Sequence, residues 1–215
     1  LQVNAYLGDA LARTTYLDLY KGLYQIQHLD WKNGRVNYDQ NFERPVPGMD
    51  FNHLAFSDME LKADSFYFCD SRIDVKIQEA KLKEKSGLKI NQLYGRFVMD
   101  SVKMQLPDLY LRTPVSNLQA SVDFDMNAFA EKNPGKIMAR VNGALGRSDL
   151  FLFIGDALPK QMKYRWPYYP MKVEGSFRGN MQRASCSGVR LSLPTVFQLS
   201  TDGTVANLMD MDHLK

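Results

Sequence analysis

Hydrophobic and polar residues alternate along much of this chain. Ile73, Val75 and Ile77, for example, are separated by Asp74 and Lys76. A period of two residues is typical of a β-strand with one buried face. The same alternation recurs at 102–106, 118–126, 137–141, 171–173 and 189–193. Strands that each have one apolar and one polar face predict an antiparallel sheet with one dry and one wet side.

Residues that favour turns interrupt these runs. Asn33-Gly34 predicts a type I′ hairpin between strands near 23–31 and 35–38, because both residues accept the positive φ angles of that turn. Asp202-Gly203 predicts a second hairpin, between 196–200 and 204–207. Pro107 and Pro194 each follow an alternating run, so we expect a strand to stop there or to meet a sheet edge.

Helix is predicted in few places. Residues 7–13 can form one or two helical turns, and 127–132 predicts one short helix that ends before Pro134. A helical insertion is expected near 148–166, beginning at Ser148-Asp149 and broken or kinked at Pro159. Apolar residues would cover most of its circumference, so this helix must be buried on several sides or lie inside something apolar.

Two segments of the chain resemble each other. They lie near 88–126 and 171–208, and each contains an alternating run that ends in Leu-Pro, at Leu106-Pro107 and Leu193-Pro194. Repeated one-faced strands predict a sheet that grows along one axis. The apolar face of a single-layer sheet must fold over itself, accept a partner or hold an apolar ligand.

Composition limits the class of protein. The chain has 215 residues, of which 45% are hydrophobic and 24% charged, and this excludes a disordered or collagen-like chain. A net charge of +3 argues against a dedicated nucleic-acid binder. The longest apolar run, 150–154, is too short to span a membrane. Because the chain begins with Leu1 and not with Met, we expect a processed protein or a segment of a longer one, with any export signal or anchor lying upstream.

The sequence predicts no metal site and no cofactor. Cys69 and Cys186 are 117 positions apart, neither belongs to a C-x-x-C pair, and the chain has three histidines. We expect two buried or half-buried thiols, with one long-range disulfide as the alternative.

No catalytic motif is present, so the chain is predicted not to be an enzyme. Asp123 and Asp125 share one face of a strand, where a wet sheet face explains them better than a carboxylate pair. His53 has no nucleophile placed beside it by a recognisable motif, so we interpret it as a structural histidine.

Three segments carry a resemblance to a known family: Leu29-Asp30-Trp31-Lys32-Asn33-Gly34-Arg35-Val36-Asn37-Tyr38, Leu106-Pro107-Asp108-Leu109-Tyr110-Leu111-Arg112-Thr113 and Gly146-Arg147-Ser148-Asp149-Leu150. Over nearly its whole length the chain resembles the AsmA/TamB-like envelope proteins of Gram-negative bacteria, especially the form found in Bacteroidetes. The resemblance implies a long curved sheet with an apolar interior, anchored in the inner membrane by an upstream helix and extending through the periplasm. It also implies movement of phospholipid to the outer membrane, and assembly of outer-membrane proteins with a BamA/TamA-type barrel that is met outside this chain.

We therefore predict a mainly β fold, in which one repeated, curved and mostly antiparallel sheet over 1–215 forms an apolar, taco-like trough with one or two short helices. The residues predicted to line the trough are Val102, Met104, Leu118, Val122, Phe124, Ile137, Val141, Val173, Val189 and Leu191. Those predicted to plug or cap it are Leu150, Phe153 and Ile154.

The function predicted from this fold is non-enzymatic binding or conduction of lipid acyl chains in the cell envelope. Two alternatives remain open. One is a closed β scaffold that binds protein partners, for example by adding a strand at a sheet edge. The other is a carbohydrate-binding surface built on the aromatic residues Trp166, Tyr168 and Tyr169. Aromatic side chains beside basic residues can mark a membrane or a carbohydrate surface, but packing at a loop is the interpretation that we favour for them.

Overall fold

The structure, a computed structural model, describes residues 2–6, 9–18, 23–39, 44–128, 130, 132–155 and 158–206. Its elements within these ranges are twelve strands and two short helices. In chain order they are β1 (Gln2–Tyr6), β2 (Asp9–Asp18), β3 (Leu23–Asp39), β4 (His53–Cys69), β5 (Arg72–Glu84), β6 (Lys89–Met99), β7 (Lys103–Arg112), β8 (Asn117–Asp125), β9 (Ile137–Leu145), α1 (Arg147–Ile154), α2 (Lys160–Arg165), β10 (Met171–Gly179), β11 (Arg183–Leu193) and β12 (Phe197–Ala206).

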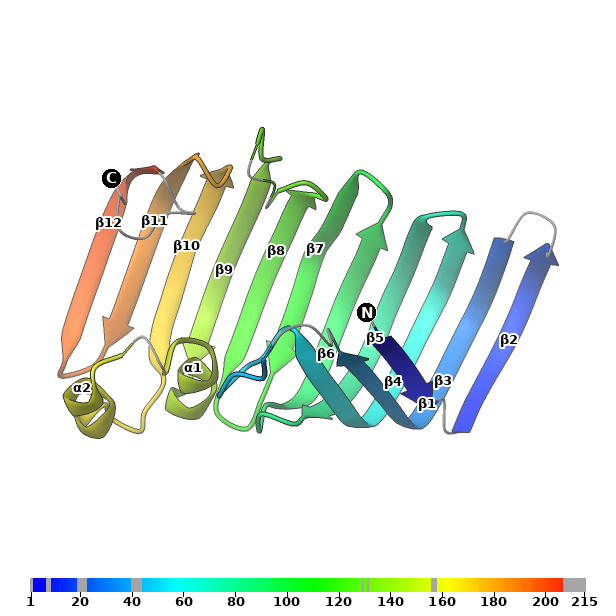
Figure 1. Ribbon diagram of the computed structural model, residues 1–215, viewed down its shortest axis with the longest axis horizontal. Helices are drawn as coiled ribbons and strands as arrows, with labels where there is room; N and C mark the ends of the chain where they lie inside the picture. Colours follow the sequence, from blue (N-terminus) through cyan, green and yellow to red (C-terminus); the bar gives the residue numbers. More distant parts are fainter. Residues whose placement is uncertain are drawn as a thin grey trace.

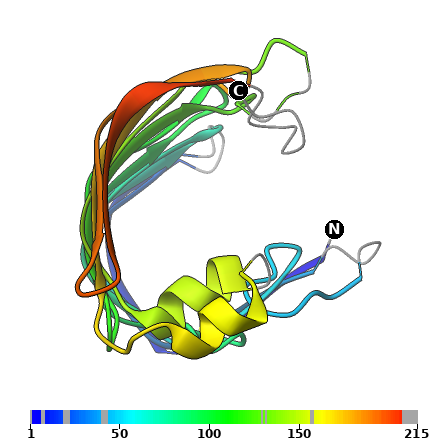
Figure 2. The same ribbon diagram turned by 90° about the vertical axis from the view of Figure 1, so that its left-hand side faces the viewer.

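All twelve strands belong to one antiparallel sheet (Figure 1). From β3 to β12 the strands are neighbours in chain order, while β1 and β2 pair with different parts of β3. Seen end-on, the sheet curls into an open trough with a C-shaped section (Figure 2). The predicted fold class is confirmed: a mainly β chain forms one curved, antiparallel, trough-like sheet with two short helices.

The lower wall of the trough is built differently at its two ends. β3 and β4 have 17 residues each and bend round to form this wall themselves (Figure 2). β9 and β10 have nine residues each, and beside them α1 and α2 lie on the open side of the sheet (Figure 1). A hydrogen bond of 2.9 Å from the Met49 amide to the Leu152 carbonyl joins the loop before β4 to α1.

Apolar side chains form rows across the concave face. Residues paired across antiparallel strands share a face, so the register defines each row. One row runs from β3 to β12 through Tyr24, Phe68, Ile73, Met99, Met104, Phe124, Ile137, Gly179, Ala184 and Val205. A second runs through Trp31, Leu61, Ala80, Leu93, Leu111, Leu118, Gly143, Val173, Leu191 and Leu199. The apolar face is therefore continuous along the sheet.

β-bulges keep these rows aligned. On β5, Ile73 and Ala80 are seven residues apart and would face opposite sides of a regular strand. Register shifts between Ile77 and Ala80 insert an extra residue, which returns Ala80 to the concave face. β7 has a shift of the same kind between Leu106 and Leu109. Pro107 lies in that bulge, β7 continues to Arg112, and β7 pairs with a strand on each side, so the prediction that the strand stops there or meets a sheet edge is wrong.

Both predicted Gly hairpins are also wrong. β3 continues through Asn33-Gly34, where Asn33 has a φ of 55° in a bulge and the Trp31 ring covers Gly34. β12 continues through Asp202-Gly203, and a neighbouring bulge lies on β11 between Cys186 and Val189. The positive φ of Asn33 suits a bulge as well as a turn, so the Asn-Gly dipeptide alone does not separate the two. At the second site the residue with a positive φ is Gly188 in the bulge on β11, and Asp202-Gly203 stays in an extended strand.

The helix predictions had mixed outcomes. Residues 9–13, predicted to be helical, begin β2, because pairing with β3 outweighs weak local helix propensity; 7–8 lie outside the described residues. Residues 126–128 form a turn, and no helix is seen in the described part of 127–132. α1 and α2 fall within the expected insertion apart from Arg147, and Pro159 precedes α2. β11 ends at Leu193, directly before Pro194, as predicted.

Very little of the chain is fully buried. Among the described residues the buried hydrophobic side chains are Ala63, Val75, Ala80, Ile90, Ala128, Leu150, Met171, Ala184 and Leu193. The accessible surface is 14457 Å², against about 10,000 Å² expected for a compact monomer of this mass. The excess follows from a sheet that lacks a second layer over most of its length.

Candidate functional site: the concave apolar face

Nine of the ten predicted lining residues lie on strands and face the concave side. Met104, Phe124 and Ile137 belong to the first row, and Leu118, Val173 and Leu191 to the second. Between the rows lie Val122, paired with Ala139, Val141, paired with Ala120, and Val189, paired with Thr201. Val102 differs, because it lies in the turn before β7 and its side chain is 63% exposed.

The predicted lining covers only part of this face. The rows extend through β3–β6 to residues that the prediction left out, among them Trp31, Leu61, Phe68 and Ile73. Their alternation is interrupted by bulges, so a strict period of two misses them. These residues are identified only by their pairing with apolar residues on the neighbouring strands.

This face is open along its length. The nine lining residues on strands are all half-buried. With a strand spacing of about 4.8 Å, the rows from β3 to β12 span roughly 45 Å. The result is a long apolar strip whose side chains pack against their neighbours in the sheet but lack a covering layer over most of the strip.

The helices cover one corner of the strip. Leu150, 6% exposed, packs against Met171 and Leu193, and Phe151 contacts the Trp166 ring edge-on. Phe153 and Ile154, predicted to plug the trough with Leu150, are 49% and 40% exposed. α1 therefore extends the lower wall, with Phe153 lying 6.4 Å from Phe51 between ring centroids.

A buried carboxylate fixes α1 to the sheet. Asp149 accepts a hydrogen bond from the Ser116 hydroxyl at 2.5 Å and another from the Thr113 hydroxyl, in the turn between β7 and β8. The hydroxyl oxygen of Ser116 in turn accepts a hydrogen bond of 2.8 Å from the Gly146 amide. Asp149 thus sets the position of the helix, a role that the sequence indicated only as a helix start.

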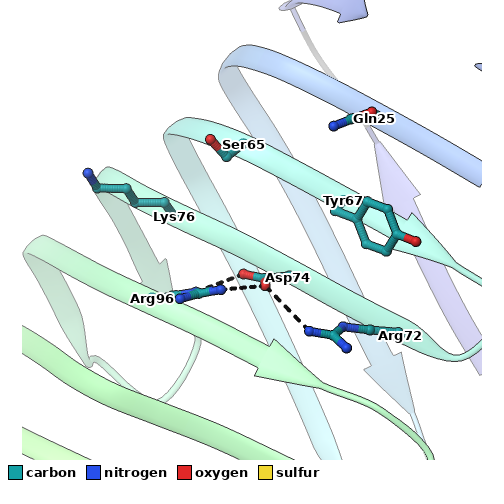
Figure 3. A pocket seen from close by; sticks show the side chains of 7 residues that line it. All are labelled: Gln25, Ser65, Tyr67, Arg72, Asp74, Lys76 and Arg96. Atoms are coloured by element: carbon teal, nitrogen blue, oxygen red, sulfur yellow. Dashed lines mark hydrogen bonds and ion pairs between the residues drawn. The ribbon is translucent and has the colours of Figure 1, made fainter. Parts of the chain in front are cut away.

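A shallow hollow of about 550 Å³ lies on the outer, polar face (Figure 3). Its lining residues are Gln25, Ser65, Tyr67, Arg72, Asp74, Lys76 and Arg96. Arg96 donates to both oxygens of Asp74, at 2.9 and 2.6 Å, and this guanidinium holds the pKa of Asp74 below its ordinary value despite partial burial. Arg72 also lies 3.9 Å from the Asp74 carboxylate, so two of the three cations in the hollow pair with its one carboxylate, an arrangement usual on a wet sheet face.

Asp123 and Asp125 lie on this same polar face, as predicted. Lys103 lies 3.5 Å from the Asp123 carboxylate, and Gln105 donates to Asp123 at 2.7 Å. The Asp125 carboxylate accepts the Lys136 amide at 2.9 Å. These contacts are those of a solvated ladder of polar side chains.

His53 is buried and has a structural partner. Its Nδ1 lies 2.9 Å from Asp50, which also accepts the Val46 and Asn52 amides. The Val46 amide, followed by His53 and Asn52, holds the pKa of Asp50 below its ordinary value, although burial opposes this. The pair fixes the loop that meets α1, in agreement with the structural interpretation of His53.

Cys69 and Cys186 are free thiols. The described residues contain no cluster of three metal-binding side chains, and no helix among them has the length and apolarity needed to cross a membrane. Trp166 packs edge-on between Phe151 and Phe197, so its ring belongs to a cluster of aromatic side chains.

Comparison of the chain with protein-family models, with curated proteins and with solved structures returns no match.

Proposed function

We propose that this protein binds lipid acyl chains along its concave apolar face and acts without catalysis. The observation that carries this proposal is the uninterrupted pairing of apolar residues from β3 to β12 on a face that stays open to solvent. Contiguous exposed apolar surface of this extent marks an interaction site for an apolar partner.

The driving force is removal of methylene groups from water, which contributes about 0.8 kcal/mol for each group buried. A strip of roughly 45 Å exceeds the bilayer hydrocarbon core of about 30 Å, so it has room for the chains of a whole phospholipid. The head group would remain at the open side of the trough, next to water. No single side chain carries this activity, because the contact is spread over the rows.

The resemblance to AsmA/TamB-like proteins extends the proposal to a place in the cell. We place the chain in the periplasm, attached to the inner membrane by a segment outside these 215 residues. There it would pass acyl chains toward the outer membrane, support outer-membrane protein assembly, or do both. A BamA/TamA-type barrel would be met through other parts of the protein.

The direct test is mass spectrometry of a solvent extract of the purified chain, compared with a soluble protein of similar size from the same host. We expect stoichiometric phospholipid in the extract, and uptake of a fluorescent fatty acid from vesicles. Absence of both lipid and uptake would contradict the proposal.

Charges placed in the strip provide the second test. Val122→Asp on β8 and Leu191→Arg on β11 each put a charge among concave apolar side chains. The matched controls, Ser121→Asp and Ser192→Arg, place the same charges one residue away on the outer face. We expect lipid binding to fall at least tenfold for the first pair and to persist for the controls. Equal binding by all four variants would overturn the proposal.

A partner-binding scaffold is the second candidate function. Its supporting observation is that β12 pairs with β11 alone among the described strands, and its ten residues carry one charge, Asp202. An edge of this kind suits strand addition by a partner. Pull-down with Thr201→Pro, which would block the edge, distinguishes this candidate from lipid binding.

A further inference from the structure

The outer, polar face of the sheet carries a pair of stacked tyrosines. Tyr94 on β6 lies directly opposite Tyr110 on β7, with the ring centroids 4.7 Å apart and an angle of 18° between the ring planes. Their neighbours in sequence, Leu93 and Leu111, belong to the second apolar row, so both tyrosines point away from the trough. The ring pair therefore lies on the face that meets water, and Tyr94 is 40% exposed.

The two rings help to line a hollow of about 500 Å³, a volume typical of a site for a small ligand. We name it the tyrosine hollow, and its lining includes Tyr94, Tyr110, Gln119, Ser121, Arg140 and Asn142. Gln119 is paired across the strands with Tyr110 and with Asn142, so the two amides continue the row that the rings begin. Ser121 and Arg140 are opposite each other two residues away, on the same face.

The tyrosine hollow continues toward β11. A second hollow of about 730 Å³ has Pro107, Ser121 and Arg140 in common with it, and is also lined by Ser176 on β10 and Ser187 on β11. Arg140 is paired with Ser176, and Ser176 with Ser187. At a strand spacing of about 4.8 Å, the two hollows together span roughly 24 Å from β6 to β11. A linear ligand of several rings fits this shape.

The polar side chains of the tyrosine hollow can both donate and accept hydrogen bonds. The amides of Gln119 and Asn142 each have an acceptor oxygen and a donor nitrogen, and the guanidinium of Arg140 is a donor. Within the described part of the chain, these three side chains have no hydrogen bond or ion pair. Their bonding capacity is available to a ligand whose own groups both donate and accept, and a sugar hydroxyl is such a group.

The tyrosine pair favours a sugar over a proline-rich peptide, which is the other ligand that aromatic grooves commonly bind. Tyr94 and Tyr110 stack on each other, so no slot for a proline ring lies between them. The face of a tyrosine ring is rich in electrons and attracts polarised C–H groups. One side of a pyranose ring presents such C–H groups, while its hydroxyls project from the rim toward polar neighbours.

We propose that the tyrosine hollow binds an oligosaccharide. One sugar ring packs against the tyrosine pair, and Gln119, Asn142 and Arg140 hydrogen-bond its hydroxyls. Further sugar units lie along the serines toward β11. This inference goes beyond acyl-chain binding and does not depend on it, because the hollow and the apolar strip are on opposite faces of the sheet. The site is also distinct from the aromatic loop after α2, where the sequence suggested a carbohydrate-binding surface.

The experiment is isothermal titration calorimetry of the 215-residue chain with cellotetraose, chitotetraose and tetragalacturonic acid, and with decaproline as the competing ligand class. We compare the wild type with Tyr110→Ala and Asn142→Ala. The matched controls are Tyr164→Ala, which removes an exposed tyrosine on α2, and Gln198→Ala, which removes an exposed amide on the outer face of β12. Circular dichroism verifies that each variant is folded.

We expect at least one tetrasaccharide to bind with a Kd below about 1 mM. Tyr110→Ala should weaken this binding about tenfold, and Asn142→Ala about fivefold. Because the Asn142 side chain is exposed and makes no contact that holds the sheet, its effect separates ligand contact from loss of folding. Both controls, and Leu191→Arg in the acyl-chain strip, should bind as the wild type does.

Three results would overturn the inference. The first is that no tetrasaccharide binds at about 5 mM, where even a weak site fills. The second is that both variants in the hollow bind as tightly as the wild type. The third is that decaproline binds in place of the sugars.

Discussion

The Asp149 carboxylate at the start of α1 accepts the hydroxyl of Ser116 across a gap of 33 positions in sequence. This contact joins the helical part of the lower wall to the turn between β7 and β8. The same Ser116 oxygen also accepts the Gly146 amide, so the two residues act as one unit with the backbone.

Removing either partner should loosen α1 from the sheet. We expect Asp149→Asn to lower the free energy of unfolding by about 1–3 kcal/mol, because an amide oxygen is a weaker acceptor than the carboxylate for the two buried hydroxyls of Thr113 and Ser116. Ser116→Ala should cost a similar amount, and the double variant less than the sum. Urea unfolding measures all three. Ser148→Ala, an exposed neighbour, serves as the control, and strict additivity of the two variants would contradict the coupling.

A glycine in the second apolar row has no space for a side chain. Gly143 on β9 has a φ of 154°, and a β-carbon there would collide with the Asn117 carbonyl on β8. We expect Gly143→Ala to destabilise the protein by about 3 kcal/mol in urea unfolding. The comparison is Gly203→Ala on β12, where a β-carbon meets open space and the change should be close to neutral. Similar values for both would show that steric contact is not the cause.

Acid should destabilise the fold through buried carboxylates. Burial of Glu84 opposes its ionisation, but hydrogen bonds from Ser86, Ala55 and Lys85 outweigh burial and hold its pKa below the ordinary value. A carboxyl whose folded pKa is depressed stabilises the fold above its unfolded pKa of about 4.3, and this contribution is lost as the pH falls through the folded pKa.

We therefore expect the free energy of unfolding in urea to fall between neutral pH and about pH 3. Asp50, whose pKa is also lowered, contributes in the same direction. Glu84→Gln should be less stable than the wild type at neutral pH and less sensitive to acid. An unchanged acid dependence in Glu84→Gln would assign the effect to other carboxylates.

The bulge on β11 should be needed for the apolar rows. Gly188, with a φ of 59°, lies between Cys186 and Val189, and its amide donates to Asp202 at 2.5 Å. Deleting Gly188 would turn the first part of β11 over, because a shift of one residue exchanges the faces of a strand. We expect faster amide hydrogen exchange in β11 and β12 after the deletion. Gly188→Ala, which keeps the residue count, should have a smaller effect.

Alternation by itself determined the class of this fold. Asp74 and Lys76 alternate with apolar residues along one strand. This alternation specifies which face of the strand meets water, and it does not depend on which strands lie beside it. Apolar faces on successive strands then require one antiparallel sheet with a dry side. The scarcity of helix and the location of the insertion near 148–166 follow from local sequence too.

The tertiary structure alone decided register, bulges and the covering of the corner. Asn33-Gly34 and Pro107 are locally consistent with a turn and a strand end, but pairing with neighbouring strands makes bulges of both. The pairing of Ser116 with Asp149 depends on segments distant in sequence, which a local pattern does not contain. The sequence determined that the chain has an apolar face; long-range backbone pairing decided that this face is one continuous, open strip.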